Sequence, residues 1–160
     1  MPVVFLQREA SCAICALHVD DGELAAHEVW RNELWLLRHH PQPAPLTGWC
    51  LLDARRHCAG PLDFAPEEAR EWGVVVQRAS LLVKQVTGCE RVYAIAFGEG
   101  ARHLHLHLIP RSGDDPRTTA WKIADLYRHV EAGKVAAASA DCVNDWLQRA
   151  RAMAPRLLNG

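Results

Sequence analysis

The segment RHLHLHLIPR, residues 102–111, places three histidines at alternate positions, each followed by a leucine. Side chains alternate between the two faces of a β-strand, whereas a helix would distribute positions 103, 105 and 107 around its circumference. The pattern therefore predicts a strand with its histidines in a row on one face, about 6.6 Å apart, and its leucines on the other. We expect the leucines to face the core, the histidines to face water or a shallow cleft, and Pro110 to end the hydrogen-bonded ladder.

Three histidines in a row on one face of a strand indicate a catalytic or metal-binding site. Threonine, lysine or glutamate would serve a solvated strand face equally well, whereas histidine titrates, binds metals and acts as a nucleophile near neutral pH. The alternative is an amphipathic strand whose polar side happens to be histidine. That interpretation is reasonable for one histidine and much weaker for three, so this segment is the first candidate for a functional site.

Length and composition favour one soluble globular domain over residues 1–160. The chain has 160 residues, of which 49% are hydrophobic and 23% charged, and its formal net charge is −1. No basic face or run stands out, so we do not expect nucleic acid as a partner. The N-terminus lacks the pattern of a signal peptide, and no apolar run approaches the roughly 20 residues that span a bilayer. We therefore expect a cytoplasmic protein with no membrane partner.

One long helix is predicted over residues 64–88. Apolar side chains recur at spacings of three and four between Trp72 and Val86, which makes a stripe suited to burial. Pro66 suits the first turn of this helix, and Gly88 suits its C-terminal cap. We expect the stripe to meet the leucine face of the histidine strand.

The remaining elements complete an α+β arrangement. Residues 98–101, GEGA, predict the turn of an antiparallel hairpin that ends in the histidine strand. The order of strands, long helix, two strands and further helices indicates a mainly antiparallel sheet with the long helix packed on one face. Strands are predicted at 27–30, 33–40, 48–57, 90–97 and 102–109, and shorter helices at 121–129 and 140–153.

The cysteines favour free thiols over disulfides. Four of the six are scattered singly, and each is best explained as a small buried hydrophobic residue. Cys12 and Cys15 differ because they form a C-x-x-C pair. In a reducing compartment such a pair indicates a redox motif or half of a zinc site.

Taken together, these residues resemble the histidine triad (HIT) superfamily of nucleotide hydrolases and transferases, in particular its zinc-containing bacterial type. The family signature of alternating histidines and apolar residues, followed by Pro-Arg, is complete over residues 103–111. The similarity runs from about Cys12 to Arg111 and includes RRHCAGPLDFAPEEA. It implies a HIT-like α+β fold with a mainly antiparallel five-stranded sheet, a core of about 12–111 and a C-terminal helical extension of about 112–160. It also implies a homodimer.

The resemblance implies a reaction at phosphorus. In the family, the middle histidine attacks the α-phosphorus of a nucleotide such as a dinucleoside polyphosphate or nucleoside phosphoramidate, and the covalent nucleotidyl-histidine is then resolved. By position the nucleophile is His105, and His107 is placed to hydrogen-bond the phosphate or the leaving group, so both are predicted to be catalytic. Such covalent catalysis divides one difficult displacement into two easier ones. Candidate nucleotide- and phosphate-binding residues are Glu99, Gly100, Ala101 and Arg111.

A structural zinc site is implied by the same resemblance. Cys12, Cys15, His57 and His103 correspond to the ligands of the zinc-containing branch. Two thiolates and two imidazoles form a closed tetrahedral site, in which the protein fills every position. We therefore expect the zinc to be structural, and no catalytic metal is expected. The alternative is an unliganded cysteine pair.

The sequence departs from the family's pattern in three places. Trp49 stands where many members have a histidine, Glu99 and Gly100 stand where many have Gln and then Ser or Thr, and residues 38–45 lack the Asn or Asp that many use for the ribose. A nucleotide hydrolase or nucleotidyl transferase remains the first hypothesis, because the triad is intact. The departures favour a second, a nucleotide-binding regulatory protein with little turnover. A third, a hydrolase whose triad binds a catalytic metal, lacks nearby Asp or Glu ligands.

Overall fold

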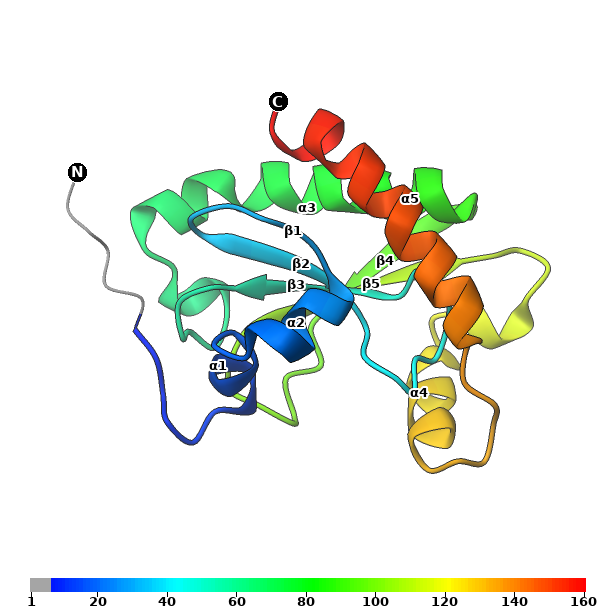
Figure 1. Ribbon diagram of the computed structural model, residues 1–160. Helices are drawn as coiled ribbons and strands as arrows, with labels where there is room; N and C mark the ends of the chain where they lie inside the picture. The colour runs from blue at the N-terminus through cyan, green and yellow to red at the C-terminus, as the bar shows by residue number, and fades with distance from the viewer. Residues whose placement is uncertain (1–6) are drawn as a thin grey trace.

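The computed structural model describes residues 7–160 and shows an antiparallel sheet with helices on both faces (Figure 1). The strands are β1 (Glu28–Arg31), β2 (Trp35–His39), β3 (Cys50–Ala54), β4 (Arg91–Ile95) and β5 (His105–Arg111). The helices are α1 (Ala13–Leu17), α2 (Asp21–His27), α3 (Pro66–Thr87), α4 (Ile123–Glu131) and α5 (Ala140–Leu158). The strand order is β1–β2–β3–β5–β4, and each neighbouring pair is antiparallel, which confirms the predicted α+β fold.

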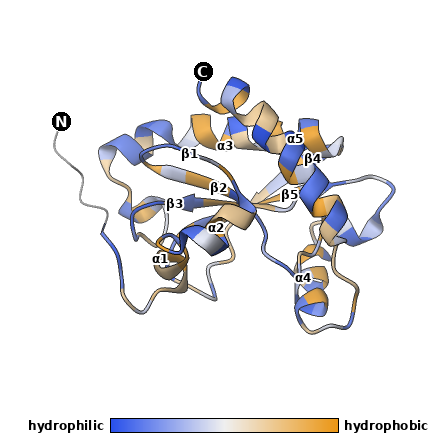
Figure 2. Ribbon diagram, in the orientation of Figure 1, coloured by the Kyte–Doolittle hydropathy of each residue, from blue (hydrophilic) through white to orange (hydrophobic). Residues whose placement is uncertain are grey.

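The main core lies between the sheet and the helices α3 and α5, which cover the same face (Figure 1). The three leucines of the histidine segment pack there with apolar residues of α3, so the predicted contact between the leucine face and the long helix is confirmed. Both helices carry apolar and polar residues along their length (Figure 2), as expected when one side is buried. None of the helices in residues 7–160 combines the length and hydropathy that a bilayer-spanning segment needs.

A second, smaller core covers part of the opposite face. Trp49, just before β3, and Ile109 of β5 pack there against Ile123, Leu126 and Val130 on one side of α4. Within the C-terminal segment, α4 therefore covers part of the face that carries the histidines, whereas α5 lies on the opposite face with α3.

The expectation that the histidines face water or a shallow cleft is met only in part, because Cys12 and Cys15 cover His103, and Tyr127 of α4 packs against His107 at the edge of a pocket. His103 and His107 have exposed fractions of only 1% and 4%, and His105 is half-buried. The alternation predicted which residues share a face, but it could not predict that both faces of the strand would be covered.

The boundaries of the histidine strand also differ from the prediction. His103 precedes β5, which begins at His105. Pro110 does not end the strand, because pairing with β3 stops at Leu108 while pairing with β4 continues to Arg111. The antiparallel hairpin of β4 and β5 is confirmed, although its connection is longer than the predicted GEGA turn.

Two short helices, α1 and α2, were not predicted. Cys12 caps α1, because its Sγ accepts a hydrogen bond from the backbone N–H of Cys15. Asp20 caps α2 by accepting from the backbone N–H of Glu23. Helices of this length show no clear apolar period, and side-chain caps such as these stabilise their first turns.

The entrance to β3 requires glycine at position 48. Gly48 has a φ of +87°, and a Cβ there would lie 2.4 Å from Thr87 Oγ1 and 3.0 Å from Trp146 Nε1. The backbone N–H of Gly48 donates to His39 Nε2 at 2.9 Å. These contacts with α3, α5 and β2 fix the position of the next residue, Trp49, which proves important for the site.

Candidate functional site

Two cysteines and two histidines converge where α1 approaches the start of β5. One ligand atom from each of Cys12, Cys15, His57 and His103 lies within 4.8 Å of all the others. His103 Nδ1 is 3.5 Å from Cys12 Sγ and 3.4 Å from Cys15 Sγ, and His57 Nδ1 is 3.4 Å from Cys15 Sγ. Tetrahedral zinc bonds of about 2.3 Å to sulfur and about 2.0 Å to nitrogen would place these atoms about 3.5 Å apart. The cluster therefore has the size and donor set of a tetrahedral metal site.

The surroundings of this cluster suit metal binding. His103 Nε2 donates to the carbonyl oxygen of Ala54 at 2.6 Å, which leaves Nδ1 unprotonated as a ligand. Backbone N–H groups of Glu9 and Cys15 donate to the sulfurs of Cys15 and Cys12 at 3.4 and 3.5 Å, which stabilises thiolates. Burial raises the pKa of the Cys15 thiol, and the charge of a bound cation would offset that effect.

His105 and His107 lie side by side on β5, with ring centroids 5.5 Å apart. His105 Nδ1 donates to the backbone carbonyl oxygen of His103 at 2.6 Å. In the neutral ring the lone pair is therefore on Nε2. Because His103 belongs to the cysteine–histidine cluster, that cluster also holds the backbone that orients the His105 ring.

His107 has the opposite arrangement. Trp49 Nε1 donates to His107 Nδ1 at 2.9 Å, so the proton of the neutral ring is on Nε2. The rings of Phe97, Trp49 and Tyr127 surround it, with centroids 4.9, 5.8 and 6.0 Å away. Burial, assisted by the nearby His105, lowers the pKa of His107 to about 3. Near neutral pH this ring therefore carries no charge and presents an N–H donor.

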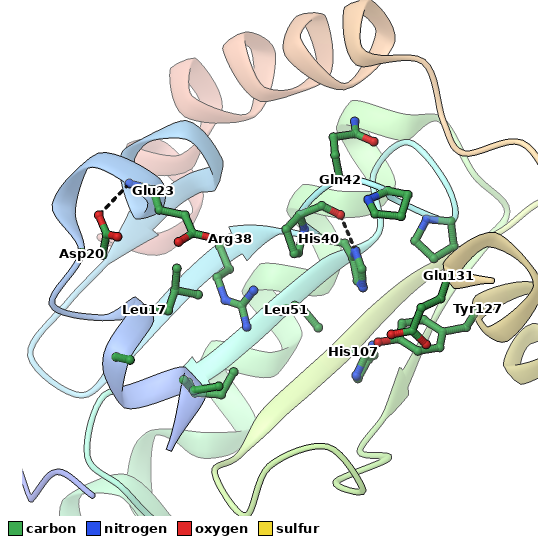
Figure 3. Close-up of a pocket in the computed structure, with 16 residues that line it drawn as sticks. Leu17, Asp20, Glu23, Arg38, His40, Gln42, Leu51, His107, Tyr127 and Glu131 are labelled. Carbon is green, nitrogen blue, oxygen red and sulfur yellow. Dashed lines mark hydrogen bonds between the residues drawn. The ribbon is translucent and has the colours of Figure 1, made fainter. Parts of the chain in front are cut away.

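A pocket with a volume of 590 Å³ opens beside His107 (Figure 3). Helix α1 contributes apolar side chains to it, residues 41–45 contribute three prolines, and α4 contributes Tyr127. Arg38, Leu51 and His107 come from three successive strands and form its floor on the sheet (Figure 3).

A buried ion pair lies at this floor. Arg38 donates to Asp53 through Nε at 2.7 Å and Nη2 at 3.3 Å, and His18 Nε2 lies 2.9 Å from Asp53 Oδ2. Burial alone would raise the pKa of Asp53, but the charge of Arg38 and the hydrogen bonds from His18 and Arg38 hold it at about 2. This ion pair was not predicted from the sequence. Its signal is that two charged residues interrupt strands that otherwise read as apolar.

The other predicted site residues are residues 99–101 and Arg111. They are close to the His105–His107 pair in the sequence, but within residues 7–160 they form no hydrogen bond with it. Residues 99–101 belong to the connection that leads to His103, where Glu99 and Gly100 are exposed and Ala101 is half-buried. Arg111 lies six positions beyond His105 on β5, about 20 Å along the strand. Its Nη1 contacts the carbonyl oxygen of Ser112 and, at 3.0 Å, the hydroxyl of Thr118. The fold therefore places Arg111 at the opposite end of β5 from His105.

Known proteins resemble this chain in structure and not in sequence. No family model matches the chain, and no curated protein matches its sequence. The structure is similar to that of a Zn-bound histidine triad family protein from Mycobacterium smegmatis, with a TM-score of 0.65 and 18% identity over 92% of this chain and 95% of that one. It is also similar to a Hit-like protein involved in cell-cycle regulation from Bartonella henselae, with a TM-score of 0.64 and 16% identity over 91% and 98%.

A third solved structure agrees. A histidine triad protein from Bradyrhizobium japonicum matches with a TM-score of 0.59 and 21% identity, over 82% of this chain and 93% of that one. Identities this low establish the fold alone, and the fold agrees with the resemblance carried by the triad segment and the cysteine pair. The chain has the fold of the histidine triad proteins.

Proposed function

We propose that this protein is a nucleotide hydrolase or nucleotidyl transferase that forms a covalent nucleotidyl-histidine at His105. The supporting observation is the pair of oppositely arranged imidazoles. His105 offers a lone pair at Nε2, and His107 offers a proton at Nε2, with the two rings 5.5 Å apart and His107 lining the pocket. Displacement at phosphorus needs such a nucleophile and such a donor close together.

The reaction follows from these two roles. Nε2 of His105 attacks the α-phosphorus, and a P–N bond forms as the bond to the leaving group breaks and its electron pair departs with that group. A neutral imidazole approaches the anionic phosphate without charge repulsion. His107 donates an Nε2–H hydrogen bond to the phosphate or the leaving group and keeps its proton. A nucleotide leaving group departs as a phosphate anion, whereas an amine leaving group takes up a proton from solvent as its bond to phosphorus breaks. Water or another hydroxyl acceptor then attacks the phosphorus and gives its proton to solvent, and the bond to His105 breaks with its electron pair returning to Nε2.

The pocket supports a nucleotide as the substrate, either a dinucleoside polyphosphate or a nucleoside phosphoramidate. Its volume of 590 Å³ falls within the range of small-ligand sites. Its apolar wall, from α1 and the prolines of residues 41–45, suits the flat face of a base.

We also propose that Cys12, Cys15, His57 and His103 bind one structural zinc ion. The interatomic distances and donor set fit the ion, and the similar Mycobacterium smegmatis protein is Zn-bound. When bound, zinc would supply a cross-link between α1, the segment after β3 and the residue two positions before His105. It takes no part in the reaction.

A second candidate is a nucleotide-binding protein with little turnover. Trp49 favours it, because this side chain is fully buried against His107 at a position where many HIT proteins have a histidine.

One experiment separates the candidates. Wild-type protein and the variant His105→Ala are incubated with adenine and guanine dinucleotides and phosphoramidates, with and without brief chelation. We expect hydrolysis by the wild type that is insensitive to chelation and at least about a thousandfold slower in the variant. The control His129→Ala, which changes an exposed histidine on α4, should retain full activity.

The other outcomes are equally clear. Binding of nucleotide by the wild type without turnover would support the second candidate. Turnover that chelation abolishes and added metal restores would contradict nucleophilic catalysis by His105.

A further inference from the structure

Arg38 has one side of its guanidinium group occupied and the other side open to the pocket. Nε and Nη2 donate to Asp53 at 2.7 and 3.3 Å, which uses one edge of the group. The edge formed by Nη1 and Nη2 remains, and Arg38 lines the pocket even though its side chain is only 4% exposed. Figure 3 shows the guanidinium group directed into the pocket beside Leu51. A free guanidinium edge presents two parallel N–H groups, the geometry that binds a phosphate or carboxylate.

The position of Arg38 is fixed before any ligand binds. Asp53 is fully buried, and its carboxylate is held by His18 as well as by Arg38. If Arg38 turned away, it would leave a buried carboxylate without its charged partner, which is strongly unfavourable. A donor held in place in this way binds an anion without a further loss of side-chain entropy.

The sheet sets the distance between Arg38 and the histidine pair. Arg38 is paired with Leu51 across β2 and β3, and Leu51 is paired with His107 across β3 and β5. All three side chains lie on the same face (Figure 3). Two strand spacings separate the Cα atoms of Arg38 and His107 by about 10 Å. A ligand that reaches both residues therefore carries two separate groups, one for each.

The remaining charges of the pocket restrict where a second anion can bind. The side chains of Asp20, Glu23 and Glu131 line the pocket and repel negative charge. Within residues 7–160, Arg38 is the one arginine or lysine that lines the pocket, and its ion pair is with Asp53 and with none of these three. An anionic group is therefore attracted to the floor at Arg38 and disfavoured elsewhere.

We propose that Arg38 binds a second phosphate group of the substrate, separate from the phosphate that reacts at His105. This inference rests on the proposed function and narrows the substrate to nucleotides with at least two phosphates. The second phosphate has two possible sources, a phosphate on the ribose or a further phosphate of the polyphosphate chain. The same guanidinium edge serves either source.

Binding measurements on the full chain test the proposal. The probes are adenosine 5′-monophosphate, adenosine 5′-diphosphate, the adenosine 2′,5′- and 3′,5′-bisphosphates, and inorganic pyrophosphate. We expect at least one doubly phosphorylated nucleotide to bind about tenfold or more tightly than the monophosphate, the effect of one charge-assisted interaction. Preference for a bisphosphate assigns the ribose as the source, and preference for the diphosphate assigns the chain.

The variant that tests the residue is the double substitution Arg38→Gln with Asp53→Asn, which removes both charges and so leaves no unpaired carboxylate. In this variant, the affinity for the doubly phosphorylated nucleotide should exceed that for the monophosphate by less than about twofold. Thermal unfolding shows whether the variant folds. The matched control is Arg70→Gln with Glu67→Gln, which removes an exposed ion pair on α3 and should retain the advantage.

The same measurements distinguish a failure of the role proposed for Arg38 from a failure of the proposed function. If the wild type binds the monophosphate as tightly as every doubly phosphorylated nucleotide, or if the double variant keeps the preference, the role of Arg38 is wrong and the proposed function stands. If no nucleotide binds but pyrophosphate binds the wild type and not the double variant, the phosphate site is supported and the proposed function is wrong. Absence of binding by every probe contradicts both.

Discussion

At the scale of single residues, two histidines of one strand acquire different roles from their Nδ1 partners. A carbonyl oxygen accepts the Nδ1 proton of His105, and the indole of Trp49 donates to Nδ1 of His107. The sequence places both rings on one face, but it does not show which nitrogen carries the proton. Trp49 is far from the triad in the chain, and only the pairing of β3 with β5 brings it to His107.

The variant Trp49→Phe tests this assignment. It removes the donor to His107 Nδ1, so the ring should populate both tautomers and present its Nε2–H less often. We expect kcat to fall about tenfold, the effect of one hydrogen bond of about 1.4 kcal/mol. Nitrogen-15 NMR should show the Nε2–H tautomer of His107 in the wild type and a mixture in the variant.

The control for this test is Trp121→Phe, which changes an indole that is 93% exposed. It should alter neither the tautomer nor the rate. A Trp49→Phe protein that kept the single Nε2–H tautomer would show that other contacts hold His107.

At the scale of elements, a helix could be predicted from the sequence where its apolar residues repeat regularly over several turns. The long helix was expected at 64–88 and is found at Pro66–Thr87, because its buried stripe repeats over several turns. The last helix was expected to end at 153, before Pro155, yet it continues to Leu158. Proline costs one backbone hydrogen bond there, while Ala154 and Leu158 remain packed in the main core.

The candidate site was predictable only where a short motif marks it. The C-x-x-C pair and the triad marked two cysteines and three histidines, and the resemblance to the zinc-containing HIT proteins added His57 as the fourth member of the cysteine–histidine cluster. The pocket was not predictable, because Arg38, Tyr127 and the prolines of residues 41–45 meet only through the topology of the sheet and the return of α4. No local pattern marks residues that are joined in this way.

The link between α1 and β5 can be tested through its cysteines. Wild-type protein purified without a histidine tag should contain about one zinc ion per chain, and the variant Cys12→Ser with Cys15→Ser should contain none. Because the variant lacks the cross-link that zinc would supply, we expect it to lose about 3 kcal/mol of stability, which lowers the Tm by about 10 °C in a protein of this size. Elemental analysis and thermal unfolding measure the two effects.

The control for the zinc test is Cys142→Ser, because Cys142 is exposed and lies outside the cluster. It should retain both the zinc and the Tm. Wild-type protein without zinc would contradict the assignment of this cluster.

At the scale of the whole molecule, three buried histidines make folding dependent on pH. Burial lowers the pKa of His39 and His40 to about 4 and that of His107 to about 3, whereas in the unfolded chain each is about 6.5. As pH falls from about 6.5 towards 4, the unfolded chain binds protons that the folded protein does not. The free energy of unfolding should therefore decrease, by up to about 1.4 kcal/mol per pH unit for each histidine.

Urea denaturation between pH 8 and pH 5 measures this dependence. The midpoint should change little from pH 8 to pH 7 and fall clearly from pH 6.5 to pH 5. Zinc-free protein is used, so that release of metal does not contribute, and in that protein His103, whose pKa burial also lowers to about 4, adds to the decrease. The exposed-histidine variant His129→Gln should follow the same curve, and a midpoint that stays constant down to pH 5 would contradict the neutral state of these three rings.

The covering of the histidine face by α4 has a consequence for how such proteins diversify. Tyr127 contacts the His107 ring and Glu131 lines the pocket, although both follow β5 in the chain. The histidine pair proposed to react is thus anchored in the sheet, while a helix from a later part of the chain shapes the space in front of it. Substitutions in that helix can change which molecules enter without altering the proposed nucleophile, so two chains with identical histidine rows need not share a substrate.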